Sequence, residues 1–204
     1  MTGISRGRGG RASRRCVCAC AFVGALALAC GGRTRTKAGV DPNAIRLVPL
    51  ASAIVLETAG PPPSDTTVTL TAGEPRVVVL RHGPPENVVF AELSFASNAF
   101  RADSGQPVRI EVRPRPGVYG LDLTASAPLD RGTAVTFKYA RYFSAPARAR
   151  VAYGSDVLYE RALVVGQIEA GTGQLALLPS TRPVADNLQA RLPAAGTFVV
   201  AAAP

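Results

Sequence analysis

The chain has few of the residues on which metal, redox and nucleophilic chemistry commonly depend. Its 204 residues include one histidine, no tryptophan and four cysteines. The cysteines are Cys16, Cys18, Cys20 and Cys30, so residues 31–204 contain none. A disulfide within that stretch is excluded, and a zinc site of the usual His and Cys type lacks its ligands. We expect a domain that is held together by its apolar core.

Acidic residues are missing from the N-terminal segment. Residues 1–37 contain eight of the 23 basic residues and no acid, whereas the remaining 15 basic residues accompany all 14 acids. The net charge of +9 therefore describes the N-terminal segment, and residues 38–204 are nearly neutral. Phosphate backbones are bound by clustered basic faces. The charge distribution predicts no nucleic-acid partner.

An apolar run too short to cross a bilayer follows the basic segment. Residues 16–29, CVCACAFVGALALA, number 14, whereas a membrane-spanning helix needs about 20. The small residues Ala27 and Ala29 occupy the −3 and −1 positions before Cys30. A basic stretch, a short apolar run and small residues at the cleavage point are typical of a secretory signal peptide. We predict such a signal over residues 1–29.

The end of this segment resembles a bacterial lipoprotein signal, in which the cysteine directly after the cleavage point is acylated. The usual pattern has Leu at −3, a small residue at −2 and Gly or Ala at −1, whereas this chain has Ala27, Leu28 and Ala29. The resemblance implies a lipid on Cys30 and a cell-envelope location. No aspartate follows Cys30, which implies the outer membrane in a two-membrane bacterium. Ordinary cleavage, giving a periplasmic or secreted protein with a free thiol, is the alternative.

The remainder of the chain indicates a tether and one all-β domain. Residues 30–44 are polar and unpatterned, which predicts a flexible tether. Residues 45–204 contain short apolar runs separated by Gly, Pro and Asp turns. About ten strands without helical periodicity predict an antiparallel β-sandwich, immunoglobulin-like or Greek-key. Two smaller sandwiches divided near residues 102–107 are the alternative.

Individual runs make sharper predictions. Residues 108–113 alternate strictly, so their three aliphatic side chains should face the core. Residues 76–81, RVVVLR, form a continuous run that favours a strand buried on both faces or packed at the core centre. Residues 148–153 are also predicted as a strand, and a short helix is expected only within residues 158–168.

Residues 175–202, LALLPSTRPVADNLQARLPAAGTFVVAA, resemble the last three strands of the immunoglobulin-like sandwich domains of ankyrins and zonula-occludens-type proteins. The resemblance implies a connecting turn at Ala185, Asp186 and Asn187. It also implies that Phe198 fills the core. A scaffold or binding module is what the resemblance suggests about function.

The sequence shows no recognised catalytic constellation. His82 follows a predicted strand and precedes Gly-Pro-Pro, a position typical of a solvated turn residue, and no G-x-S-x-G elbow is present. Scattered acids such as Asp122 and Asp130 leave loop calcium binding as an alternative. A carboxylate-dependent hydrolase is a further alternative, since such carboxylates are distant in sequence. We predict a non-enzymatic protein with no catalytic residue, cofactor or metal.

One basic–aromatic region is the candidate ligand site. Cationic and aromatic side chains here could face anionic lipid headgroups or an acidic glycan; the residues are Lys138, Tyr139, Arg141, Tyr142 and Arg148. The competing interpretation is that the aromatic side chains alternate into the core while Arg stems cover the surface. Arg109, Arg113 and Arg115 are adequately explained by pairing with acids such as Asp122.

Together these features predict an envelope-tethered lipoprotein with a non-catalytic sandwich that serves as a binding or scaffold module. Its expected partners are the membrane, through the lipid on Cys30, and another envelope protein or a glycan. A secreted or periplasmic module that binds a glycan or anionic lipid is the alternative.

Overall fold

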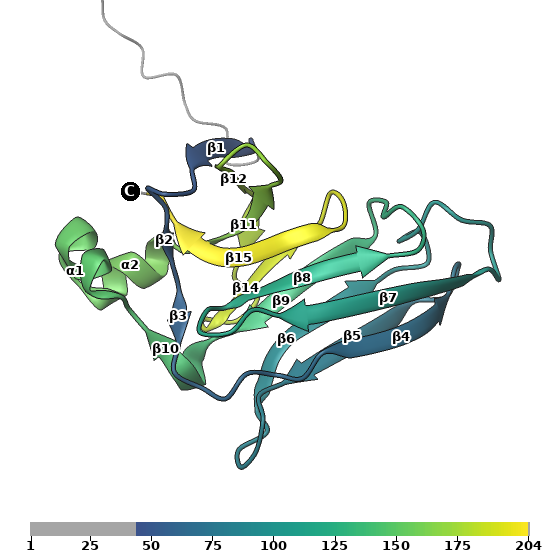
Figure 1. The fold of residues 1–204 in the computed structure, drawn as a ribbon, viewed down its shortest axis with the longest axis horizontal. Helices are drawn as coiled ribbons and strands as arrows, with labels where there is room; N and C mark the ends of the chain where they lie inside the picture. Colours follow the sequence, from purple (N-terminus) through teal and green to yellow (C-terminus); the bar gives the residue numbers. More distant parts are fainter. Residues whose placement is uncertain (1–43, 204) are drawn as a thin grey trace, which may run out of the picture. The chain divides into compact units, whose positions relative to one another are not determined.

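The computed structural model describes residues 44–203, so the predicted signal, the acylation at Cys30 and nearly all of the predicted tether lie outside the described residues. The described chain is mostly strand and forms two main antiparallel sheets (Figure 1). This confirms the predicted all-β, sandwich-like fold. Residues 44–203 form fifteen strands where about ten were expected, because several are only two residues long.

The larger sheet has eight strands. Its order is β1 (Arg46–Pro49), β12 (Gln174–Leu177), β11 (Val164–Glu169), β15 (Gly196–Ala202), β8 (Gly120–Ala125), β7 (Pro107–Pro114) and β4 (Thr66–Thr71), and β2 (Ile54–Val55) also pairs with β15. All of these pairings are antiparallel.

The second sheet has five strands. Its order is β13 (Ser180–Thr181), β14 (Asn187–Arg191), β9 (Thr133–Lys138), β6 (Val89–Phe95) and β5 (Arg76–Arg81). A separate two-stranded ribbon joins β3 (Glu57–Thr58) to β10 (Phe143–Ser144). The chain passes repeatedly from one sheet to the other, so strands on either side of residues 102–107 pair in both sheets, β4 with β7 and β6 with β9.

The main core lies between the sheets and follows the alternation of the strands. In β7, Val108, Ile110 and Val112 are buried, as predicted. Phe198 on β15 is fully buried and joins the same cluster, as predicted. A smaller cluster that includes Val199 packs on the opposite face of β15. Apolar contact on both faces makes β15 the most enclosed strand at this end of the larger sheet.

The prediction that the strand at residues 76–81 is buried on both faces or lies at the core centre is wrong. They form β5 with the predicted bounds, but β5 is an end strand of its sheet. The side chains of Val78 and Leu80 face the core, whereas Val77 and Val79 are 59% and 42% exposed. A β-branched run therefore marks a strand here without marking a central one.

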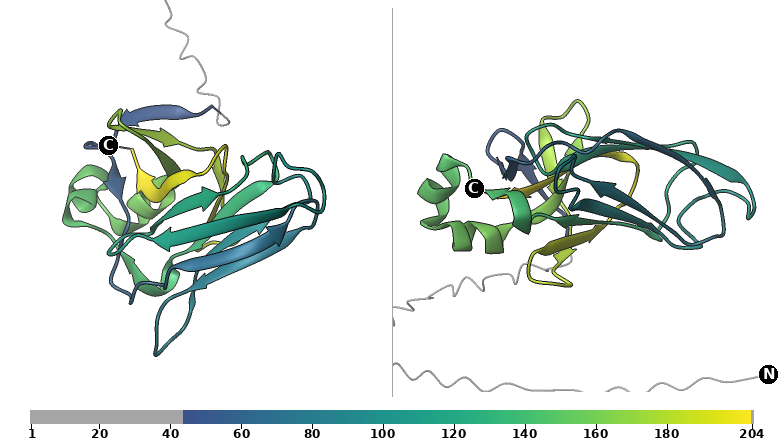
Figure 2. Two further views of the ribbon diagram at one scale, coloured as in Figure 1. Left: turned by 45° about the vertical axis from the view of Figure 1, so that its right-hand side comes forward. Right: turned by 90° about the horizontal axis from the view of Figure 1, so that it is seen from below.

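Two short helices adjoin one end of the sheets (Figures 1 and 2). They are α1 (Ala147–Tyr153) and α2 (Asp156–Ala162), and a 3₁₀ turn η1 (Ala140–Tyr142) precedes them. The predicted strand at 148–153 is wrong: Pro146 precedes the helix and Gly154 ends it with a φ of 76°. Proline before a helix and glycine after it are standard boundary residues. The helix expected within 158–168 is α2, which begins two residues earlier.

No helix in residues 44–203 combines the length and the apolar character that crossing a membrane requires.

Candidate functional site

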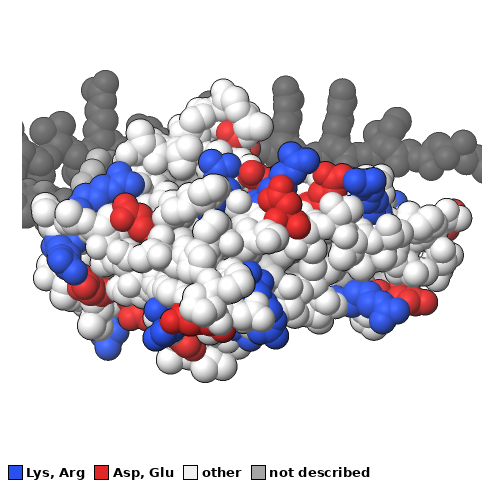
Figure 3. Space-filling view, turned by 60° about the horizontal axis from the view of Figure 1, so that its bottom comes forward, with Lys and Arg blue, Asp and Glu red and all other residues white. Residues whose placement is uncertain are grey.

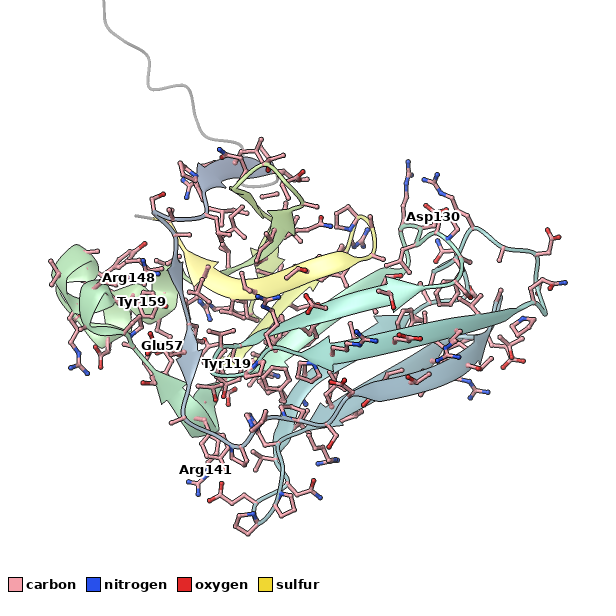
Figure 4. The ribbon with its side chains drawn as sticks, viewed as in Figure 1. Glu57, Tyr119, Asp130, Arg141, Arg148 and Tyr159 are labelled. Carbon is pink, nitrogen blue, oxygen red and sulfur yellow. The ribbon has the colours of Figure 1, made fainter. Side chains whose placement is uncertain are left out.

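All five tyrosines of the chain lie in one connected row of aromatic side chains, which we call the aromatic seam. Neighbouring ring centroids in the row are between 4.6 and 6.4 Å apart. Figure 4 shows Tyr119 among the strands and Tyr159 at the helices. The rings in order are Tyr142, His82, Tyr119, Tyr139, Phe143, Tyr159 and Tyr153. The row runs from the sandwich core to α1 and α2.

The tyrosine hydroxyls of the seam are used in hydrogen bonds. Tyr119 donates to the carbonyl of Tyr139 at 3.2 Å, and Tyr159 donates to the carbonyl of Ile54 at 3.2 Å. Tyr153 donates to the carbonyl of Ala203. Burial raises the pKa of Tyr119 and of Tyr139 to about 12. These hydroxyls stay protonated at neutral pH, and those of Tyr153 and Tyr159 join the helices to the sandwich.

Arg182 joins the seam to the end of α2, a role that no motif in the sequence indicates. Its Nη2 donates to the carbonyl of Glu160 at 2.5 Å and to that of Leu163 at 3.2 Å, while Nη1 donates to the hydroxyl of Tyr139. The last carbonyls of a helix have no partner within the helix. Arg182, about twenty residues further along the chain, supplies a hydrogen-bond partner for these carbonyls.

The structure places the five predicted ligand residues at this end of the domain, but pairs them within the protein. Lys138 Nζ lies 2.6 Å from Glu92 Oε1, and Arg148 Nη2 donates to the carbonyl of Ala53 at 2.8 Å. Tyr139 is fully buried. This arrangement agrees with the competing interpretation of the sequence, in which aromatic side chains turn inward and cationic side chains remain at the surface.

Arg141 and Tyr142 converge on one carboxylate. Arg141 Nη2 lies 2.5 Å from Glu86 Oε1, and the hydroxyl of Tyr142 donates to Glu86 Oε2. The Arg141 hydrogen bond, followed by that of Tyr142, lowers the pKa of Glu86. The ion pair therefore stabilises the loop at residues 83–88 when the pH is above the ordinary pKa of glutamate. This stabilisation is lost as the pH falls and Glu86 becomes protonated. A shallow groove of about 630 Å³ lies beside Arg141 and Lys138.

His82 is not the solvated turn residue that the sequence predicted. Its side chain is 1% exposed, with Nδ1 2.8 Å from the carbonyl oxygen of Pro61. A carbonyl can only accept, so Nδ1 carries the hydrogen. Nε2 is buried and has no hydrogen-bond partner within the described chain. The segment at Pro61 covers the end of β5, a long-range contact that local sequence does not reveal.

The acidic residues are distributed along the surface, and several of them pair with arginine. Arg109 lies 2.9 Å from Glu111, and Arg115 lies 3.2 Å from Asp122 on the neighbouring strand, as predicted. Asp130 lies far from the seam (Figure 4). Acidic and basic side chains lie beside one another on the face shown in Figure 3. Within residues 44–203, no three His, Cys, Asp or Glu side chains gather as a metal site would require.

The outer face of the five-stranded sheet presents the other candidate surface. Val77 and Val79 are exposed at its β5 end, and a shallow groove of about 480 Å³ lies beside Val77, Ser94 and Gly132. Fold and surface thus define an all-β, sandwich-like domain with an aromatic seam at one end and an apolar strand at one sheet edge. Comparison with known proteins found no matching family model, no matching curated protein and no matching solved structure.

Proposed function

We propose that this protein is a lipid-tethered component of the cell envelope whose sandwich is a non-catalytic binding or scaffold module. The observation that carries the proposal is the order of the N-terminal features: a basic segment, the apolar run 16–29, Cys30 and a polar stretch. The first strand of the domain begins at Arg46, sixteen residues after Cys30. The lipid anchors the protein, and the sandwich contacts another envelope component.

The chemistry of the described surface supports a binding role. Lys138 and Arg141 have carboxylate partners, and the tyrosine hydroxyls of the seam are occupied by hydrogen bonds. Among the exposed apolar groups of the described chain are Val77 and Val79 of β5, and a shallow groove lies beside Val77. Apolar strand edges and flat sheet faces are surfaces that proteins use to bind other proteins.

The second candidate is a secreted or periplasmic module that binds a glycan or an anionic lipid. The groove beside Lys138 and Arg141 favours it. An anionic ligand would have to compete with Glu86 and Glu92 for these two cations. Replacing Arg141 and Arg148 with Ala should then weaken retention on anionic glycans or vesicles; equal retention would count against this candidate.

The anchoring is tested by the mass of the N-terminal peptide of native protein purified from membranes. We expect a peptide that begins at Cys30 and carries the mass of two or three acyl chains. The Cys30→Ala variant is the control and should lose both the modification and the membrane association. A peptide that begins at an unmodified Cys30 would refute the anchor and favour the secreted module. A chain that begins at Met1 would refute export altogether.

A further inference from the structure

The two helices expose aliphatic side chains on their outer sides. Val151 on α1 is 88% exposed, and Val157 and Leu158 on α2 are 56% and 51% exposed. Ala149 and Tyr159 lie on the opposite sides of the same helices and are fully buried. Both helices project from one end of the sheets (Figure 2). We call the surface formed by Val151, Val157 and Leu158 the helical cap.

The chain enters the domain beside this cap. A recess of about 390 Å³ is lined by Ala44 and Arg46 together with Tyr153 at the end of α1 and Ala162 at the end of α2. The polypeptide that leads from Cys30 therefore joins the domain at the end from which the helices project. Strand β5 lies across the domain from β1 (Figures 1 and 2).

This end of the domain has two cations without a carboxylate partner among residues 44–203. They are Arg46 on β1 and Arg161 in the last turn of α2, and neither belongs to an ion pair there. Each other cation of this end has an acid in the same surroundings; the pairs are Arg150 with Asp156, Arg148 with Glu57 near Tyr159, and Arg182 with Glu160 near Tyr139. The charge that remains is positive.

The stretch that precedes the domain is basic as well. Residues 31–45 contain three basic side chains, Arg33, Arg35 and Lys37, and one acid, Asp41. Basic residues close to a membrane anchor attract anionic lipid headgroups. The sequence next to Cys30 and the described surface beside Ala44 thus favour the same kind of partner.

We infer that the helical cap rests on the anionic surface of the membrane in which Cys30 is anchored. The three aliphatic side chains enter the headgroup region, as the apolar face of an interfacial helix does. Arg46 and Arg161 lie beside lipid phosphates, and their long stems let the guanidinium groups remain in water. The inference rests on the proposed lipid anchor and adds the orientation of the domain.

The tether makes such a small contact sufficient. Fifteen residues separate Cys30 from Arg46, and a flexible chain of that length has a root-mean-square span of about 20 Å. Contact between cap and bilayer is then intramolecular, and its effective concentration is high. A fluid bilayer also closes around isolated projecting side chains, whereas a protein partner must be closely packed against them. With the cap on the membrane, β5 stays accessible to another envelope component.

The test uses an introduced tryptophan, because the chain has none. Full chains with Leu158→Trp or Val77→Trp are purified from membranes and reconstituted in vesicles of phosphatidylcholine and phosphatidylglycerol with brominated acyl chains. Leu158→Trp should emit at shorter wavelength and be quenched by bromine. Val77→Trp is the matched control, because Val77 is 59% exposed on β5, and should show neither effect. Circular dichroism verifies that both chains fold.

The role of charge is tested in the Leu158→Trp chain. Adding Arg161→Glu should weaken the quenching, whereas Arg191→Glu, the same reversal at an exposed position of β14, should leave it unchanged. Vesicles of phosphatidylcholine alone should also give weaker quenching. Equal quenching in all of these cases would overturn the part assigned to the two arginines.

The mass of the N-terminal peptide, measured on the same preparations, separates this inference from the anchor. An acylated Cys30 with an unquenched Leu158→Trp would overturn the inference and leave the anchor intact. Equal quenching of Leu158→Trp and Val77→Trp would also overturn it. An unmodified Cys30 with a quenched Leu158→Trp would refute the anchor and uphold the contact. An unmodified Cys30 without quenching would refute both.

Discussion

His82 illustrates how a chemically versatile residue can serve as a packing element. Its imidazole lies 4.6 Å from the ring of Tyr142 and 5.2 Å from that of Phe90, measured between centroids. The bond from Nδ1 to the carbonyl of Pro61 connects the end of β5 with a segment twenty-one residues earlier. With Nε2 enclosed and the ring buried, the side chain offers a substrate no approach.

At this scale we predict the effect of truncating His82. His82→Ala leaves a cavity among aromatic rings and an unpaired carbonyl at Pro61, and should lower the free energy of unfolding by about 3 kcal/mol. His82→Phe keeps the packing and loses only the hydrogen bond, so its cost should be about 1 kcal/mol. Urea denaturation measures both. Equal and negligible costs would show that the ring does not contribute to the core.

At the scale of elements, the helices depend on the aromatic seam for their position. Both are seven residues long, and isolated helices of that length are unstable in water. Tyr153 and Tyr159 supply the packing, and Arg182 binds the carbonyls at the end of α2. The helical end is therefore maintained by contacts with the sandwich.

We predict that Arg182→Ala releases α2 before it affects the sheets. The loss of its hydrogen bonds to Glu160, Leu163 and Tyr139 should lower the free energy of unfolding by about 2 kcal/mol. Amide hydrogen exchange in α2 should accelerate while exchange in β7 stays slow. Arg161→Ala, in the exposed last turn of α2, is the control and should cost less than about 0.5 kcal/mol. Similar exchange profiles in the two variants would contradict this role.

At the scale of the whole molecule, buried phenols couple stability to alkaline pH. Burial raises the pKa of Tyr119 and Tyr139 to about 12 and that of Tyr159 still further, whereas an exposed tyrosine ionises near pH 10. Groups whose folded pKa is raised contribute stability below the unfolded pKa and lose it as pH rises through the folded one.

We therefore expect the free energy of unfolding to fall between about pH 10 and pH 12. Tyrosinate absorbance should rise in the same range in which near-ultraviolet circular dichroism is lost. Replacing Tyr119 and Tyr139 together with Phe should flatten the pH dependence. Titration of all five tyrosines near pH 10 in a chain that keeps its tertiary signal would contradict the prediction.

Much of the fold follows from local pattern. The structure has β5 at Arg76–Arg81, the bounds predicted from sequence. The strict alternation of β7 fixes which of its side chains face the core. The strand prediction for residues 148–153 failed because Pro146 and Gly154 act as helix boundaries, a signal that was available and was outweighed by the apolar spacing.

The candidate site was less predictable. Residue type identified the basic–aromatic region, and the inward side chain of Tyr139 agrees with the competing interpretation of the sequence. The carboxylates that pair with Lys138 and Arg141 are Glu92 and Glu86, 46 and 55 residues earlier in the chain. These pairs form only when the sheets are assembled. The spacing of residues along the sequence therefore could not show that the two cations have carboxylate partners.

The all-β character of the protein and the lack of cysteines for a disulfide within residues 31–204 can be deduced from the sequence alone, because side-chain periodicity and cysteine content are local properties. Three features became evident only from the folded chain: β5 is an end strand, His82 is buried, and Arg182 binds the end of α2. These facts depend on which distant segments meet. That is settled by the order of strands within the sheets, which no local pattern encodes.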